Sequence, residues 1–158
     1  MIVEAGTYTG NGTSKNVSLS EIGGTPDFVL VKADSTYYGN FWITGMSAPN
    51  SERMNSLTIT TGITAVAAGQ FSVGAHNVAN ANGVIYNFIA IYDDGNGDFD
   101  VGTYVGDGSD DVQISGLGFE PECVWVTEIN NGNNAKWHAE CMGASTDTSA
   151  DLCKVPGI

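Results

Sequence analysis

Gly6-Thr7-Tyr8-Thr9-Gly10-Asn11-Gly12-Thr13 decides the fold, because this stretch occurs twice and returns as Gly102-Thr103-Tyr104-Val105-Gly106-Asp107-Gly108-Ser109. The sequences that follow also match once one residue is dropped from the second: Pro26-Asp27-Phe28-Val29-Leu30-Val31 falls on Pro121-Glu122-Cys123-Val124-Trp125-Val126, and Trp42 on Trp137. The shared order indicates an internal repeat with a period of roughly 95 residues. That period is too long for a solenoid unit and is typical of a duplicated small domain.

Short strands joined by glycine-rich turns are what the repeated stretch predicts. Thr-Tyr-Thr and Thr-Tyr-Val combine β-branched and aromatic residues, which suit a pleated strand. The Gly-Asn-Gly and Gly-Asp-Gly segments tolerate positive φ, as a tight turn requires. Val17-Ser18-Leu19 and Val112-Gln113-Ile114 then alternate, so we expect each unit to open with a hairpin, with residues 16–19 beside residues 2–9 in the first.

The remainder of the first unit predicts further strands. Residues 27–33 are a continuous apolar run that predicts a central strand covered on both faces. Residues 41–43, 57–60, 69–74 and 84–92 also read as strands, with a polar loop at 45–55 and an Asn-rich turn at 77–83. Together with 21 glycines and no long helical periodicity, this pattern predicts an all-β antiparallel β-sandwich of jelly-roll or lectin-like type.

The domain organisation follows from how much of the repeat is present. We expect one complete module at residues 1–93, an acidic Gly-rich linker at 94–100 and a second related β unit at 101–158. The second unit lacks the strands that end the first, and a sandwich without them has an unpaired edge. We therefore expect it to be completed by strands of another subunit or of a longer chain.

The charge balance limits the classes of partner. The 158 residues carry 5 Lys plus Arg against 18 Asp plus Glu, a net charge of −13. This balance argues against nucleic acid or an anionic membrane surface as partner. The excess is concentrated late: residues 1–93 carry 6 acids and 3 bases, and residues 94–158 carry 12 acids and 2 bases. The chain has no basic start or long apolar segment, so we expect neither a signal peptide nor membrane insertion.

One acidic segment has the chemistry of a cation site. Asp94, Asn96, Asp98 and Asp100 alternate with Gly95, Gly97 and Phe99, so oxygen ligands recur at every second residue in a loop able to wrap Ca²⁺. The segment lacks the glycine and distal glutamate of an EF-hand loop. The alternative is a solvated acidic linker, and we expect that no cofactor is required.

Four aromatic residues are candidates for contact with glycans, because aromatic rings with polar edges stack on sugars. They are Tyr37, Tyr38, Trp42 and Trp137. Trp42 and Trp137 hold equivalent places in the repeat, which favours a packing role for both. Tyr37 and Tyr38 lie in a turn and are the better candidates for an exposed pair.

Catalytic chemistry is not indicated, and we expect the chain not to be an enzyme. His76 and His138 are the only histidines, and no Gly-x-Ser-x-Gly pattern is present. Cys123 takes the place of Phe28 and is expected to be a small buried residue. Cys141 and Cys153 could form a disulfide, or bind Zn²⁺ with His138, although their spacing matches no common zinc site.

The assembled motifs resemble a family of repeated lectin-like β-sandwich modules found in virion structural proteins of tailed phages, often marine. The motifs that carry this resemblance are residues 6–12 and 102–108, Leu117-Gly118-Phe119-Glu120-Pro121-Glu122-Cys123-Val124-Trp125-Val126, residues 69–74 and Val78-Ala79-Asn80-Ala81-Asn82-Gly83-Val84-Ile85-Tyr86. The resemblance implies a non-enzymatic, self-assembling virion subunit, such as a head decoration, fibre or tail-associated protein. Its partners would be copies of itself or other virion proteins, and it transfers no catalytic residue. The alternative is a carbohydrate-binding adhesin or receptor-binding module, with or without Ca²⁺, that recognises glycans on a host surface.

Overall fold

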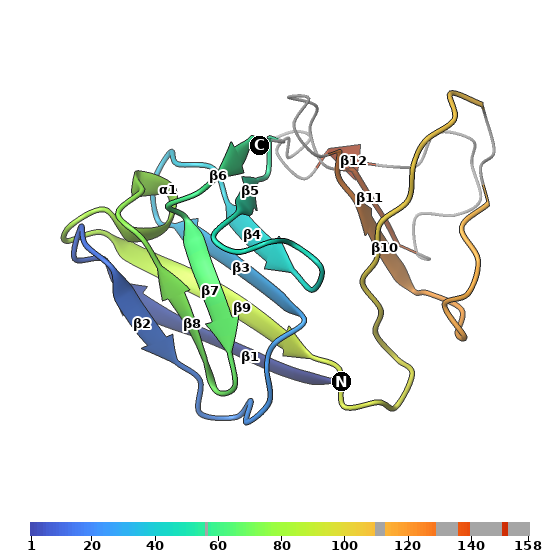
Figure 1. The fold of residues 1–158 in the computed structure, drawn as a ribbon, viewed down its shortest axis with the longest axis horizontal. Helices are drawn as coiled ribbons and strands as arrows, with labels where there is room; N and C mark the ends of the chain where they lie inside the picture. Colours follow the sequence, from blue (N-terminus) through green and yellow to red (C-terminus); the bar gives the residue numbers. More distant parts are fainter. Residues whose placement is uncertain (56, 110–112, 129–135, 140–149, 152–158) are drawn as a thin grey trace.

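The chain folds into an antiparallel β-sandwich with a smaller β-sheet beside it (Figure 1). The computed structural model describes residues 1–55, 57–109, 113–128, 136–139 and 150–151. Within these ranges strands dominate, and the single helix, α1, spans only Asn77–Asn80. The predicted all-β antiparallel sandwich is therefore confirmed. No helix in the described part of the chain is long and apolar enough to cross a membrane.

The larger layer is a six-stranded sheet in the order β1-β9-β3-β4-β5-β6, with every neighbouring pair antiparallel. Its strands, in that order, are β1 (Ile2–Thr9), β9 (Ile85–Tyr92), β3 (Phe28–Ala33), β4 (Asn40–Ile43), β5 (Ser51–Arg53) and β6 (Thr58–Ile59). β3 lies inside the sheet between β9 and β4, so the prediction of a central strand at residues 27–33 is confirmed.

Two three-stranded sheets complete the description. One forms the second layer of the sandwich, in the order β2 (Lys15–Ser18), β8 (Gln70–Val73) and β7 (Ile63–Ala67). The other stands beside the sandwich (Figure 1) and contains β10 (Cys123–Val126), β11 (Lys136–Ala139) and β12 (Ala150–Asp151).

The core lies between the two layers of the sandwich and is rich in aromatic rings. Tyr8 of β1 stacks on Tyr86 of β9 with ring centroids 5.3 Å apart. Phe71 of β8 meets the Tyr8 ring edge-on at 6.1 Å and the Phe88 ring at 5.3 Å. These contacts join strands of both layers, which is why the alternate side chains of β1 and β9 are buried.

The expected opening hairpin is wrong. β1 pairs with β9 and β2 pairs with β8, so the strands on either side of the glycine turn belong to different layers. The turn crosses between the layers because it is bonded to the segment after α1: Gly10 N donates to Val84 O at 2.8 Å, and Gly83 N donates to Gly10 O at 2.9 Å. A Cβ at Gly10 would lie 2.1 Å from Ala81 O, so only glycine allows this approach.

Asn80, at the end of α1, holds the rest of this turn in place. Its side chain is 0% exposed, and its Nδ2 donates to Gly74 O at 2.9 Å, to Asn11 Oδ1 at 3.0 Å and to Thr13 O. Its Oδ1 accepts from Asn11 N at 2.8 Å, and its backbone oxygen accepts from Gly12 N at 2.9 Å. The Gly-Asn-Gly turn of the first unit is thus held in place by hydrogen bonds to the buried residue Asn80.

The predicted polar loop at residues 45–55 is also wrong in part, because it contains β5. Ser51 and Glu52 are buried, and β5 pairs with β4 through Asn40↔Arg53 and Phe41↔Glu52. The buried Asn40 satisfies this polar strand: its Nδ2 donates to Glu52 O at 2.8 Å, and its Oδ1 accepts from Ser51 Oγ at 3.1 Å. Asn40 thus supplies partners for the Ser51 hydroxyl and the Glu52 backbone, which allows these polar residues to be buried in a strand.

The edge strand β1 carries a buried acid, Glu4, that points toward the core. Its carboxylate accepts hydrogen bonds from Ser20 N at 2.8 Å, Glu21 N at 2.8 Å and Ile22 N at 3.2 Å, and from Ser20 Oγ at 3.1 Å. Burial by itself would raise the pKa of Glu4, but the hydrogen bonds outweigh burial and hold the pKa below its ordinary value of 4.5. The ionised form therefore stabilises the fold.

Glu4→Gln should lower the free energy of unfolding by about 2 kcal/mol at pH 7, because a charge-assisted set of hydrogen bonds is replaced by a neutral one. A folded-state pKa below the unfolded one gives stability that is present above the unfolded pKa and is lost as pH falls through the folded pKa. The difference from the parent chain should thus shrink below pH 4.5. Urea titrations at pH 7 and pH 3 measure it, with Glu21→Gln as the exposed control; a difference independent of pH would contradict the assignment.

The described residues of the second unit match the first only in part. Residues 101–109, which include the counterpart of β1, form no strand, so the strand expected at 102–105 is wrong. In the first unit the equivalent stretch pairs with β9, and within the described ranges residues 101–109 have no such partner. β10 and β11 do pair like β3 and β4, but the register differs: Trp42 lies opposite Val29, whereas Trp137 lies opposite Trp125. The domain boundaries at 93 and 100 stay a prediction.

Candidate functional site

The outer face of the six-stranded sheet, which points away from the core, carries an apolar band. Side chains opposite one another in an antiparallel register share a face, so the register places two neighbouring rows of apolar residues across β1, β9, β3 and β4. This outer band consists of Val3, Ile91, Phe28 and Ile43 in one row and Ala5, Ile89, Leu30 and Phe41 in the next. The following row is polar, with Thr7, Asn87 and Lys32.

One end of the outer band is covered by Trp125 of β10. The Trp125 ring lies 5.2 Å from the Phe28 ring and 5.0 Å from the Phe41 ring, measured between centroids. Phe28 is 8% exposed and Phe41 is 2% exposed, although neither belongs to the core between the layers. The smaller sheet therefore contacts the sandwich through the aromatic cluster of Trp125, Phe28 and Phe41.

The other end of the outer band is uncovered. Val3 is 50% exposed and Ile89 is 41% exposed, and Ala5, which lies directly opposite Ile89, is also exposed. We call these three residues the exposed strip. They lie on β1 and β9, and β1 is the edge strand of its sheet. Contiguous apolar surface at a sheet edge is typical of an interaction site.

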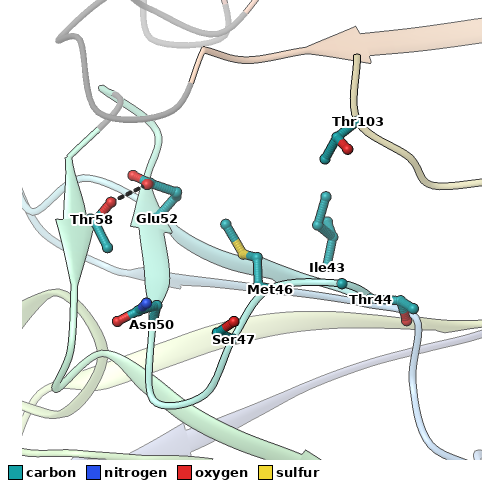
Figure 2. Close-up of a pocket in the computed structure, with 9 residues that line it drawn as sticks. Ile43, Thr44, Met46, Ser47, Asn50, Glu52, Thr58 and Thr103 are labelled. Atoms are coloured by element: carbon teal, nitrogen blue, oxygen red, sulfur yellow. Dashed lines mark hydrogen bonds between the residues drawn. The ribbon is translucent and has the colours of Figure 1, made fainter. Parts of the chain in front are cut away.

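A pocket of about 210 Å³ lies next to Phe28 and Phe41, because Ile43 and Glu52, which line it, pair with these two residues (Figure 2). It is formed by the end of β4, the loop to β5, the paired side chains of Glu52 and Thr58, and Thr103 from the chain that follows the sandwich. Figure 2 shows Thr103 across the pocket from Ile43 and the Glu52 carboxyl directed toward Thr58. The carboxyl thus does not point into the open part of the pocket.

Glu52 is the most unusual ionisable group of this region. It is 0% exposed, its Oε1 accepts from Thr58 Oγ1, and its Oε2 has no hydrogen-bond partner among the described residues. Burial raises the pKa of Glu52, and the hydrogen bond from Thr58 only partly opposes this. A buried carboxyl with one free oxygen favours the protonated form.

Glu52→Gln should raise the free energy of unfolding at pH 8 by about 1 kcal/mol relative to the parent chain, because glutamine stays neutral where the buried carboxyl must ionise. A folded-state pKa above the unfolded value of 4.5 costs stability as pH rises from that value through the folded pKa, so the gain should vanish at pH 4. Urea titrations at both pH values measure the difference. Glu21→Gln controls for net charge, and a gain of equal size at pH 4 would contradict the assignment.

The acidic segment is only partly assembled as predicted. Asp93, Asp94 and Asp98 place carboxylate oxygens within 4.8 Å of one another, and Asp100 is not in this group. Asn96 contributes its backbone amide, which donates to Asp94 Oδ1 at 3.3 Å. The Met1 ammonium lies 2.6 Å from Asp94 Oδ1 and 2.8 Å from Asp98 Oδ1.

These contacts shift the pKa values of two groups at the acidic segment. The hydrogen bond to Asp94, followed by that to Asp98, raises the pKa of the Met1 ammonium, and the same ammonium lowers the pKa of Asp94. A Ca²⁺ ion at these carboxylates would have to displace the Met1 ammonium. The Ca²⁺ site at Asp94, Asn96, Asp98 and Asp100 stays a prediction.

The four aromatic candidates for glycan contact lie in different surroundings. Tyr37 and Tyr38 line a pocket of about 260 Å³ in the β3–β4 loop, and the Arg53 guanidinium lies 4.7 Å from the centre of the Tyr38 ring. Trp42 packs against the core, in agreement with the packing role expected for it. Tyr37 also packs against the core and is half-buried, so the expectation of an exposed pair holds for Tyr38 alone. Trp137 lies on β11, and its side chain is outside the described part of the structure.

Of the remaining candidates, the structure describes the side chains of His76 and Cys123 but not that of His138. His76 begins α1, where its Nδ1 accepts from Val78 N at 3.2 Å, and burial, followed by the charge of Arg53, lowers the pKa of His76. Cys123 is exposed, so the prediction of a buried cysteine is wrong, although Phe28, its counterpart in the first unit, is buried beneath Trp125. Cys141 and Cys153 lie outside the described residues.

Comparison with known proteins gives a family and no function. No curated protein and no solved structure matches the chain. The model of one family, described as a domain of unknown function (DUF7483), matches residues 3–139, which include the sandwich apart from Ile2, the acidic segment and the β10–β11 pair. The chain therefore belongs to the DUF7483 family.

Proposed function

We propose that the chain is a non-enzymatic structural subunit that assembles with copies of itself or with other proteins of a phage virion, as a head decoration, fibre or tail-associated protein. The half-covered outer band is the observation that carries this proposal. At the covered end of the band, Trp125 shields the Phe28 and Phe41 rings from water. The exposed strip is apolar in the same way, and burial against a partner would likewise remove it from water.

The segment after the sandwich supports an assembly role in the same way. Tyr104 is 52% exposed, Val105 is 92% exposed and Ile114 is 51% exposed. A chain with a net charge of −13 repels its copies over long distances, so association depends on uncharged surfaces of this kind. Salt should therefore strengthen assembly, because it screens the repulsion while leaving apolar contact intact.

Association of the full chain can be tested by sedimentation velocity between 0.05 and 1 M NaCl. We expect oligomers that grow with salt and with protein concentration. Ala5→Lys/Ile89→Lys places charge on a directly opposed pair in the exposed strip and should abolish them. Thr7→Lys/Asn87→Lys, the next opposed exposed pair on the same sheet face, adds the same charge outside the band and should assemble normally. A parent chain that stays monomeric throughout would overturn the proposal.

The resemblance to tailed-phage modules supports the narrower proposal of a virion component. Antibody labelling of purified particles from the source of the chain tests it, since a structural subunit should decorate each particle at fixed positions. Labelling confined to unassembled protein would contradict the virion proposal, while the proposal of a self-associating subunit would still stand.

A carbohydrate-binding adhesin is the second candidate, and the tyrosine pocket favours it. Tyr38 is 44% exposed and lies with Tyr37 and Lys32 around a surface pocket, where stacking and hydrogen bonding to a sugar ring are both available. Binding on a glycan array that is lost in Tyr38→Ala would support this candidate. Retention of binding in that variant would remove the pocket from consideration.

A further inference from the structure

A second apolar surface lies on the smaller sheet. Successive side chains of a strand point to opposite faces, so Val124 and Val126 point away from the face on which Trp125 meets the sandwich. Val124 is 38% exposed and Val126 is 39% exposed. β10 is also the edge strand of its sheet. We call Val124 and Val126 the β10 ridge.

We propose that the β10 ridge of one copy packs on the exposed strip of a second copy, so that copies join head to tail. This inference rests on the proposed function, since it names the contact by which the subunit assembles. The occupant of the exposed strip is thus a second copy of this chain, and the contact joins two different surfaces.

Continuity with the existing contact inside the chain supports this pairing. The exposed strip is the same outer band that already seats a residue of β10, since Ala5 and Ile89 share a row with Phe41, and Phe41 contacts Trp125. The outer band thus accepts an apolar strand of the smaller sheet at one end. The other face of that same strand is left exposed, and it has matching apolar chemistry.

The charge distribution also supports a second copy as the occupant. Neither the exposed strip (Val3, Ala5 and Ile89) nor the β10 ridge contains a charged side chain, although the chain carries a net charge of −13. Two identical acidic molecules can approach most closely where neither presents charge. Burial of such surfaces gives the apolar gain without the cost of desolvating ions.

The geometry of a head-to-tail contact has a definite consequence. A contact between two different patches leaves a free strip and a free ridge at the ends of every open assembly, so growth continues until a ring closes or a filament forms. A contact of one patch with its own copy would stop at a dimer. The proposal therefore predicts oligomers larger than dimers in the parent chain.

Two variants, each of which alters one of the two surfaces, test this contact. Ala5→Lys/Ile89→Lys removes the exposed strip and keeps the β10 ridge, and Val124→Lys/Val126→Lys does the reverse. Each variant alone should be monomeric, with self-association weakened by more than about tenfold. An equimolar mixture should form a 1:1 complex of limited size, because one intact strip meets one intact ridge and neither variant can extend further. Sedimentation velocity and mass photometry measure both results.

Other outcomes overturn the inference in ways that separate it from the proposed function. A ridge variant that still self-associates while the strip variant does not would indicate strip-to-strip contact and leave assembly intact. A strip variant that still assembles alone would exclude the exposed strip. A monomeric parent chain would overturn assembly itself. Where a lysine pair unfolds the chain, the milder Ile89→Thr and Val124→Thr/Val126→Thr variants serve in its place, and assembly unchanged in either would contradict the contact.

Discussion

Replacing Asn80 with alanine is expected to lower the free energy of unfolding by about 4 kcal/mol. The amide is 0% exposed, and its Nδ2 donates to the oxygens of Gly74 and Asn11 while its Oδ1 accepts from Asn11 N. Truncation leaves the buried Gly74 O and the part-buried Asn11 N, which lies in the turn that joins the two layers, without their side-chain partner. A buried group without a partner costs about 1–3 kcal/mol, because water does not reach it to replace the lost bond.

Urea unfolding of the full chain measures this loss, and two further variants control for it. Asn82→Ala removes an exposed asparagine two positions later and should change little. Asn80→Asp keeps the shape and the acceptor but has no N–H to donate to Gly74 O, so it should be nearly as harmful as alanine. A loss below about 1 kcal/mol in Asn80→Ala would mean that the turn is held by its backbone contacts alone.

The strands were predictable from sequence wherever an apolar run fixed them, and their partners were not. β3 and β9 are the clearest cases, because continuous or alternating apolar residues suit buried strands. The glycine turn was read as a hairpin because period-two patterns on both sides do not say which sheet a strand joins. Its real partner, Asn80, lies 69 residues from Asn11 in sequence, and no local pattern connects them.

The candidate site was less predictable than the fold. The acidic segment could be found because neighbouring carboxylates stay neighbours, and Asp94 and Asp98 do lie together. The outer band could not, because apolar residues on both faces of β3 and β9 also describe a strand buried in a closed core. Only the register, which places Ala5 beside Ile89 with both exposed, distinguishes an exposed apolar surface from a core.

Replacing Trp125 with alanine should release the smaller sheet from the sandwich, with a loss of about 3 kcal/mol in the free energy of that contact. The Trp125 ring is the aromatic cover of Phe28 and Phe41, so its removal exposes both rings to water. Hydrogen exchange should become faster in β10 and at Phe28 and Phe41, and proteolysis after residue 100 should accelerate. Exchange in β1 should stay slow, because its pairing with β9 does not involve Trp125.

Trp125→Phe tests whether ring packing is the cause. The indole Nε1 is buried and has no hydrogen-bond partner in the described part of the chain, so phenylalanine loses none of the described bonds and keeps an aromatic edge against Phe28. This variant should retain most of the contact, whereas Val105→Ala, at a residue that is 92% exposed, should change nothing. If Trp125→Phe released the sheet as fully as alanine, the contact would depend on the indole and not on aromatic packing. Because the same strand presents the β10 ridge, Trp125→Ala should also weaken assembly by freeing the ridge from its fixed position on the sandwich.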